Sequence, residues 1–152
     1  MEYPTDQLSR YTFNDHDVRG ELVQLTSSYQ TLIRGHDYPA PVQEVLGHMM
    51  VAVSLLTATL KFEGHIAVQL QGDGPLNFVA VNGNHKQELR GIARLRAELS
   101  DTDLRSMIGK GQLIITLTPE SGERYQGVVS GDADSIAEML ENYFEQSEQL
   151  HT

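Results

Sequence analysis

The sequence predicts an α+β fold, with antiparallel sheets of hairpins packed around a long buried central helix and a C-terminal amphipathic helix. Three observations lead to this class. An apolar run from Met49 to Leu60 continues a helical pattern that begins near Pro41, and a second helical pattern ends the chain. Short alternating segments, separated by turns rich in glycine, asparagine and proline, lie between them. Strands joined by tight turns form antiparallel sheets, which favours α+β over a doubly wound parallel sheet.

Two strands and a short helix are expected at the N-terminus. The strands cover Arg10 to Asn14 and Val18 to Thr26, on either side of an Asp-His-Asp turn. Ser27 and the glutamine three residues later form a capping-box pattern, which predicts a helix from about Ser28 to Arg34. Gly35 follows where a left-handed residue would end that helix.

The central helix is expected to start near Pro41, because proline is favoured in the first turn. Its apolar side chains recur at helical spacing, and they are Val42, Val45, Leu46, Met49, Val53, Leu56 and Leu60. From Met49 onward the other faces are apolar too, which predicts a helix that becomes fully buried. The run from Met49 to Leu60 is shorter than the roughly 20 residues that cross a bilayer. We therefore expect a core helix and no membrane partner.

A series of strands should follow the central helix. His65 to Gln71 alternates regularly, and Leu76 to Val81 is apolar on both faces. Asn82-Gly83-Asn84 is a strong hairpin signal, after which Lys86 to Arg96 returns as a strand.

The last third of the chain predicts a short helix, a hairpin and a final helix. Ser100 with Asp103 should cap the short helix, which ends at Gly109. Gln112 to Thr118 and Glu123 to Val129 form the hairpin around a Pro-Glu-Ser-Gly turn. The final helix starts near Asp134, and its apolar side consists of Ile136, Met139, Leu140, Tyr143 and Phe144.

Composition limits the classes of function. At 152 residues, with 39% hydrophobic residues, the chain can bury the core of one domain. The net charge of −10 repels a phosphate backbone, so no nucleic-acid partner is expected. The count of zero cysteines excludes disulfides, thiolate zinc sites and thiol redox chemistry within these residues. The N-terminus carries no basic region followed by an apolar stretch, which favours a cytoplasmic location.

No catalytic or metal-binding residue is predicted. Glu44 and His48 can share a helical face, but two ligands are too few for a closed zinc site, so a partly buried, hydrogen-bonded His48 is expected instead. The Asp-His-Asp segment is expected to be an ordinary turn rather than an acid–base cluster. The runs Gly72-Asp73-Gly74-Pro75 and Gly109-Lys110-Gly111 lack the spacing of a phosphate-binding loop and are interpreted as turns.

Arg90, Arg94 and Arg96 are the candidate anion-binding residues. In a strand they would share one face with Ile92, where they could receive an anionic partner. The plainer interpretation is cross-strand pairing with acidic residues and protection of a sheet edge.

Val79 and Val81 are the candidate residues for binding another protein. They lie on a strand that is apolar on both faces, next to a helix that is apolar all round. Apolar surface of this extent needs a second covering layer, a dimer partner or a bound polypeptide.

Five segments resemble the heat shock protein 33 family, and they are VRGELVQL (18–25), LLTATLKFEG (55–64), VQLQGDGPLNFVAVNGN (68–84), LRGIARL (89–95) and GERYQGVV (122–129). They span nearly the whole chain in the expected order. The resemblance implies the N-terminal core of a redox-regulated holdase. Such a chaperone binds unfolding proteins under heat or oxidative stress without ATP, is not an enzyme, and tends to form homodimers.

In that family a linker and a zinc module with paired cysteines follow the core. Four thiolates hold the zinc, and oxidation releases it, unfolds the linker and exposes client-binding surface. This sequence has no cysteine, so neither zinc ligands nor a redox sensor can be assigned in it.

We therefore expect residues 1–152 to be the core domain, incomplete at its C-terminus, as a fragment of a longer protein without the linker and zinc domain. No cofactor is expected in this chain. The expected partners are unfolded clients and a second copy, joined by exchange of an element at an unpaired sheet edge. The alternative function is a small-anion-binding or enzymatic domain that uses Arg90, Arg94 and Arg96 with the Gly-Asp-Gly-Pro turn.

Overall fold

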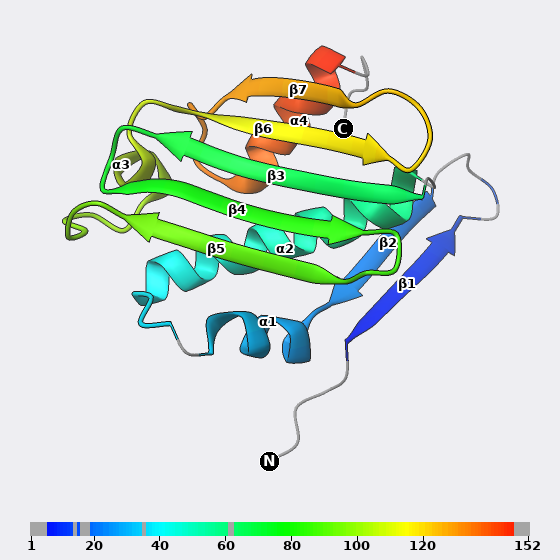
Figure 1. The fold of residues 1–152 in the computed structure, drawn as a ribbon, viewed down its shortest axis with the longest axis horizontal. Helices are drawn as coiled ribbons and strands as arrows, with labels where there is room; N and C mark the ends of the chain where they lie inside the picture. Colours follow the sequence, from blue (N-terminus) through cyan, green and yellow to red (C-terminus); the bar gives the residue numbers. More distant parts are fainter. Residues whose placement is uncertain (1–5, 14, 16–18, 35, 61–62, 148–152) are drawn as a thin grey trace.

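The structure, a computed structural model, describes residues 6–13, 15, 19–34, 36–60 and 63–147. It confirms the α+β class: a five-stranded antiparallel sheet packs against helices, and a two-stranded hairpin lies beside them (Figure 1). The large sheet has the order β5-β4-β3-β6-β7 and consists of β3 (Gly64–Gly72), β4 (Leu76–Asn84), β5 (Leu89–Leu95), β6 (Gly111–Pro119) and β7 (Tyr125–Ser130). The remaining elements are β1 (Gln7–Thr12), β2 (Arg19–Gln24), α1 (Thr26–Ile33), α2 (Ala40–Leu60), α3 (Leu104–Ile108) and α4 (Ile136–Ser147).

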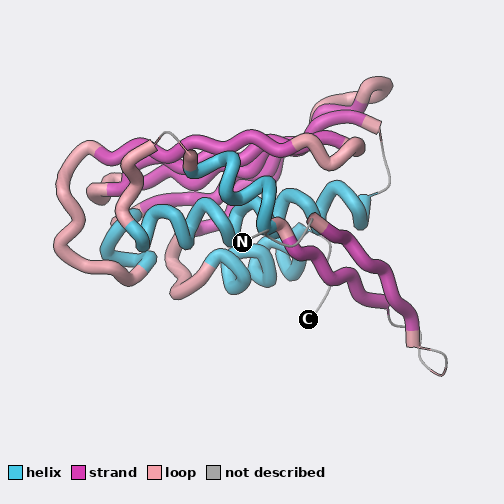
Figure 2. Tube along the Cα trace, turned by 90° about the horizontal axis from the view of Figure 1, so that it is seen from below, coloured by secondary structure: helices cyan, strands magenta, loops and turns pink. Residues whose placement is uncertain are grey.

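The helices lie on one side of the large sheet, and the hairpin of β1 and β2 projects away from this body (Figure 2). We call that hairpin the arm, and the sheet face turned away from the helices the open face. Helix α2 contacts β3, β4 and β5, whereas α4 packs against β7. The molecule thus has one covered and one uncovered sheet face.

Helix α2 is the core helix that the sequence predicts. Val42, Leu46, Met49 and Val53 are all 0% exposed, and they pack against the inward side chains of the sheet. Among the described residues, α2 over Ala40–Ala58 is the one helix long and apolar enough to span a membrane, by length and composition alone. Because its apolar side chains are buried within the protein, core packing accounts for that composition.

Strand β4 is apolar on both faces, as predicted, since Phe78 and Ala80 lie opposite Val79 and Val81, but Leu76 was predicted on the wrong face. An irregularity in the pairing with β5, between Leu76 and Phe78, shifts the alternation by one residue. Leu76 therefore faces the core together with Val79 and Val81, and all three are 0% exposed. As a client or dimer surface in this fold, Val79 and Val81 are a wrong assignment, because the helices already cover them.

The predicted Asn82-Gly83-Asn84 turn also lies elsewhere. These residues continue β4, in register with the start of β3, and the chain turns just after Asn84. Gln87 has a positive φ of 63° in this turn. A Cβ on Gly83 would approach Val53 Cγ1 to 2.6 Å, so Gly83 is needed for close packing on α2 rather than for a turn.

The helix starts were predicted with partial success. Helix α1 begins at Thr26, and the Asp6 carboxylate, rather than Ser27, accepts the first backbone N–H groups, with Asp6 Oδ1 2.9 Å from Ser27 N. Asp103 alone is the N-cap of α3, and Gly109 ends that helix with φ 71° as expected. The hairpin of β6 and β7 and the apolar side of α4 are confirmed. Two residues of the predicted Asp-His-Asp turn, His16 and Asp17, lie outside the described residues, and so does Gly35.

Two glycine-rich turns lie against each other at one end of the sheet. Asp73 Oδ1 accepts a hydrogen bond from the Lys110 N–H at 2.7 Å, and Gly74 N–H donates to the Ile108 carbonyl at 2.7 Å. A Cβ on Gly111 would lie 2.3 Å from the Gln71 carbonyl oxygen. The two runs are therefore turns, as predicted, and their glycines permit the close approach of the two backbones.

Candidate interaction surface

The arm presents an apolar outer face. Tyr11 is 48% exposed, Phe13 51% and Leu22 68%. Tyr11 pairs with Gly20 in register and its ring lies over that glycine, since a Cβ there would be 2.2 Å from the ring. Tyr11 and Phe13 stack edge to face, with ring centroids 5.8 Å apart. This cluster is the most exposed apolar group in the described part of the arm.

The opposite face of the arm attaches it to α2. Arg10 Nη2 donates to the Ala58 carbonyl at 2.8 Å, and Arg10 Nε pairs with Glu21 Oε1 at 3.0 Å. The Glu21 side chain is only 8% exposed, so the ion pair is partly shielded from water. Because Arg10 and Tyr11 point to opposite faces of one strand, anchoring the arm leaves its apolar face outward.

The open face of the large sheet carries a row of five side chains across its strands, four of them apolar and the central one, Gln69, polar. Direct cross-strand neighbours share a face. The pairs Ile92–Ala80, Ala80–Gln69, Gln69–Ile114 and Ile114–Val128 therefore define one continuous row. Its two ends are exposed, Ile92 at 39% and Val128 at 53%, whereas Ala80 and Ile114 are each only 9% exposed. We call these five residues the apolar row.

The rest of the open face is mostly polar, and the charged residues at its strand positions are two arginines. By the same registers its strand positions besides the apolar row are His65, Ala67, Gln71, Phe78, Asn82, Asn84, Arg90, Arg94, Gln112, Thr116, Thr118, Gln126 and Ser130. None of these positions holds aspartate, glutamate or lysine. A carboxylate nevertheless reaches this face, because Glu88 Oε1 accepts a hydrogen bond from Asn84 Nδ2 at 3.3 Å.

The predicted arginine strip is brought together only in part. Arg90 and Arg94 flank Ile92 on the open face of β5, as predicted, and Arg94 lies over the Phe78 ring at 5.5 Å from its centroid. Arg96 lies beyond the end of β5, and its Nε donates to the Gly74 carbonyl at 3.0 Å. The alternative function combined the three arginines with the Gly-Asp-Gly-Pro turn. Of the three, Arg96 hydrogen-bonds to that turn, whereas Arg90 lies towards the other end of the strand.

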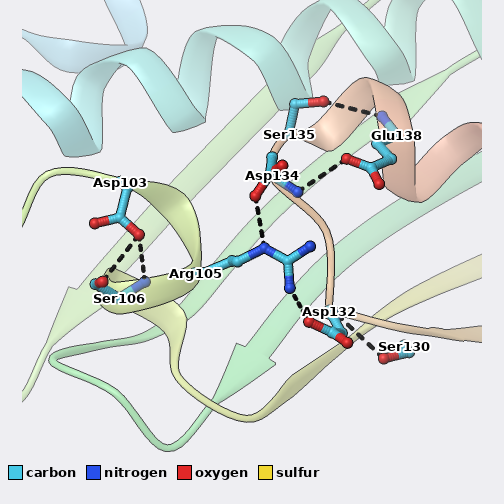
Figure 3. Close-up of polar contacts among 8 residues, drawn as sticks. All are labelled: Asp103, Arg105, Ser106, Ser130, Asp132, Asp134, Ser135 and Glu138. Atoms are coloured by element: carbon cyan, nitrogen blue, oxygen red, sulfur yellow. Dashed lines mark hydrogen bonds and ion pairs between the residues drawn. The ribbon is translucent and has the colours of Figure 1, made fainter.

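A groove of about 430 Å³ beside α2 is lined by several ionisable side chains, among them Glu44, Asp103, Arg105 and Asp134. Figure 3 shows Arg105 between Asp132 and Asp134, with an Nε–Oδ1 distance of 2.6 Å to Asp134. The hydrogen bond to Asp134 is the main cause that raises the pKa of Arg105 above its usual value. Two hydrogen bonds from Ser106, first from its hydroxyl and then from its N–H, lower the pKa of Asp103.

The hydrogen bonds of this cluster join neighbouring elements of the fold. Arg105 joins α3 to the connection between β7 and α4, and Ser135 with Glu138 caps α4. Across the groove, His48 lies 4.0 Å from Glu44, and its side chain is 59% exposed rather than partly buried. No group of three or more metal-ligating side chains occurs among the described residues.

Sequence reasoning missed the arm cluster and the apolar row. Tyr11 and Leu22 lie in strands that were predicted, but sequence alone did not show which side would be covered. The row becomes visible only from the register of five strands, because its members are far apart in the chain. Leu22 alternates poorly with its neighbours, because Val23 follows it directly, so the pattern gave no clear signal for the exposed face.

The comparisons with known proteins agree with one another. The family model for the Hsp33 protein matches residues 6–152. A 33 kDa chaperonin of Shewanella woodyi is 60% identical over 148 residues, which are 97% of this chain and 52% of the relative. The 33 kDa chaperonin of Pectobacterium atrosepticum is 57% identical, again over 97% of this chain, and 51% of the relative is covered.

A solved structure supports the fold independently. The crystal structure of a 33 kDa chaperonin, a heat shock protein 33 homologue of Thermotoga maritima, superposes with a TM-score of 0.82 at 24% identity. It covers 93% of this chain and 51% of that chain. The present chain thus spans about half the length of the relatives that it matches. Together with the match over residues 6–152, these similarities establish that the chain belongs to the Hsp33 protein family.

Proposed function

We propose that this chain is the core of an ATP-independent holdase, which binds unfolding proteins on apolar surface and prevents their aggregation. The observation that carries the proposal is the exposed apolar surface of the arm cluster, together with Ile92 and Val128 at the two ends of the apolar row, on a chain whose relatives are named chaperonins. Unfolding proteins expose apolar side chains, and burial of that surface against the chaperone is favourable by about 25 cal/mol per Å². Such binding requires no reaction, so a non-enzymatic role follows.

The turn geometry supports a mechanism without nucleotide. The backbone groups of the two glycine-rich turns bond to each other and to Asp73, rather than forming a cradle of free N–H groups. Arg105 is likewise occupied by two aspartates. Neither feature is arranged as a phosphate-binding loop.

Redox regulation, zinc and dimerisation belong to the same proposal. With zero cysteines in 152 residues, a thiol switch and its zinc must come from residues outside this sequence. We expect this chain to show no response to a mild thiol oxidant. We also propose a cytoplasmic location and a homodimer, formed through an unpaired strand edge of the arm or the sheet.

Aggregation of a heat-labile enzyme, followed by light scattering, tests the proposal. The chain at molar excess should suppress scattering without nucleotide, and L22S and V128S should suppress it less. Both residues are more than half exposed, so their replacement should alter the free energy of unfolding by no more than about 0.5 kcal/mol. Q126S, on the same strand and face as Val128, is the matched control. Scattering unchanged by the wild-type chain would refute the holdase proposal for these residues.

A further inference from the structure

Strand β7 forms an uncovered edge of the large sheet. It lies at one end of the strand order, and β6 is its one strand partner within the described part of the chain (Figure 1). Its sequence, Tyr-Gln-Gly-Val-Val-Ser, contains no charged residue and no proline, and its pairing with β6 runs without a register shift. Charges, prolines and bulges are the usual devices that keep a foreign strand off a sheet edge. Strand β7 has none of them.

The other edge strands carry such protection. Helix α1 packs against β5, where a Cβ on Gly91 would lie 2.7 Å from Leu32 Cδ1. Strand β5 also contains Arg90 and Arg94, and both strands of the arm contain charged residues. Of the described edges, β7 is therefore the one that least opposes pairing with another chain.

Every second residue of β7 turns its backbone polar groups outward. The Gly131 N–H donates to the Gly111 carbonyl at 2.9 Å, and this pair continues the register of β7 with β6. In an antiparallel pair, positions bonded in this way alternate with positions that face away. The N–H and C=O groups of Gln126, Val128 and Ser130 therefore point away from β6. These residues extend over about 13 Å, the length of an extended segment of about five residues.

The surroundings of this edge suit an uncharged strand with basic ends. Val128 is 53% exposed on the open face, and Tyr125 is 42% exposed on the other side of the strand. Helix α4 packs against β7, and a helix about 10 Å across extends beneath the place of a further strand about 4.8 Å away. The charged residues of α4 are three glutamates, with no lysine or arginine among them. Positive charge at the ends of an added strand is therefore favoured.

We propose that the β7 edge binds an extended, uncharged segment of an unfolding protein as a sixth strand of the large sheet, with basic residues flanking that segment. This inference rests on the proposed holdase function, and it names where a client segment binds and in which conformation. Backbone N–H and C=O groups are present in every unfolding chain, so pairing along an edge accepts many sequences.

A client segment fits this edge better than a second copy of the chain. Antiparallel pairing of two β7 strands would bring two α4 helices to the same side of one continuous sheet. Each copy has a net charge of −10, and each α4 brings three glutamates towards the junction, so like charges oppose this pairing. The homodimer of the holdase proposal then forms through the arm.

Hydrogen exchange of the intact chain tests the site directly. The probe is a labelled peptide with a core of alternating valine and threonine residues and a lysine at each end. At saturation it should slow exchange of the Gln126 and Val128 amides on the order of tenfold, whereas the Val129 amide, which faces β6, should not change. By fluorescence anisotropy, the same core with terminal glutamates should bind roughly fivefold more weakly.

Two methylated peptides test whether the backbone is recognised. Methyl groups on two adjacent amides of the core block both edges of the peptide and should abolish binding. Methyl groups on two alternate amides block one edge only, so the peptide can present the other edge to β7 and should bind within about twofold of the parent.

Variants of the chain test the same edge from the other side. V128P removes an outward N–H at a position where an edge strand tolerates proline, and V128K places a charge there. Both should weaken peptide binding on the order of tenfold. Q112K is the matched control, because Gln112 is exposed on the same face but lies on the interior strand β6, and it should bind like the wild type. Thermal unfolding of each variant checks that the fold is retained.

The outcomes separate this inference from the holdase proposal. If the peptide binds without slowing exchange at Gln126 and Val128, or if the two methylated peptides bind equally, docking at the β7 edge is overturned and the holdase proposal stands. If these amides become protected without peptide as the chain is concentrated, a second copy occupies the edge and the assignment to a client is overturned. If no peptide binds and aggregation is not suppressed, both proposals fail.

Discussion

Gln87 lies with its side-chain amide against Ser54, the fully buried serine of α2. Gln87 Oε1 accepts a hydrogen bond from Ser54 Oγ at 2.6 Å, and Gln87 Nε2 donates to Thr57 Oγ1 at 2.6 Å. The turn after β4 is thereby fastened to the core helix, which explains why a polar pair is tolerated there. Gln87 adopts a φ of 63°, a value that favours glycine, so its side chain must offset that cost.

Replacing Gln87 with glycine should therefore destabilise the protein although it relieves the backbone. The Ser54 hydroxyl would be left buried without its acceptor, at a cost of about 1–3 kcal/mol. Urea unfolding of Q87G, S54A and the double variant measures the coupling. We expect the double variant to lose less than the sum of the single losses. Strict additivity would show that the two side chains do not act together.

The crossing of the two glycine-rich turns predicts a strong effect at Gly111. A methyl group there would lie 2.3 Å from the Gln71 carbonyl oxygen, a backbone atom that cannot rotate away. G111A should lower the free energy of unfolding by about 1–3 kcal/mol, the usual effect of overpacking. The neighbouring control K110A should change stability by less than about 0.5 kcal/mol, because the Lys110 contacts to Asp73 are made by the backbone. Urea unfolding measures both variants, and similar unfolding midpoints for G111A and K110A would contradict this account.

The same residues show how far sequence reasoning reaches. Periodicity predicted α2 and most of the strands along the chain, because apolar spacing reflects which face is covered. It failed at Leu76, which one irregularity in the pairing moves onto the core face, and it did not show that the helices cover Val79 and Val81. It also misplaced a turn at Gly83, since a glycine that admits a neighbouring side chain looks the same in sequence as one that bends the chain.

The cap of α1 comes from Asp6, which is distant in sequence from Ser27, and no local pattern could indicate it. The candidate surface was also less predictable than the fold. The apolar row depends on the register of five strands, and a shift of one residue in any strand would turn its member toward the helices. Arg90 and Arg94 were placed correctly relative to Ile92, because their spacing lies within a single strand.

The pKa of Asp103 predicts a pH dependence of stability. Hydrogen bonds from Ser106 lower this pKa from the ordinary value of 3.8, so the folded state favours the charged carboxylate. The resulting stabilisation is present above pH 3.8 and is lost as the pH falls through the lower pKa of the folded state.

The variant D103N measures this effect, because asparagine caps a helix comparably but does not titrate in this range. The stability difference between the wild type and D103N should shrink between about pH 6 and about pH 2.5. A difference that stays constant over this interval would show that the Asp103 charge is not favoured by folding.

The attachment of the arm through Arg10 predicts local opening. In R10M the Ala58 carbonyl loses its hydrogen bond from the guanidinium, and Glu21, whose side chain is 8% exposed in the wild type, loses the ion pair at 3.0 Å. The arm contributes few buried side chains, and every residue of β1 is exposed, so its opening should be nearly independent of global unfolding. Hydrogen exchange of β1 and β2 amides should accelerate in R10M while exchange in β3 and α2 is unchanged, and R34M should match the wild type. Equal acceleration in β3 would mean that Arg10 stabilises the whole fold, since a local anchor affects only the strands that it holds.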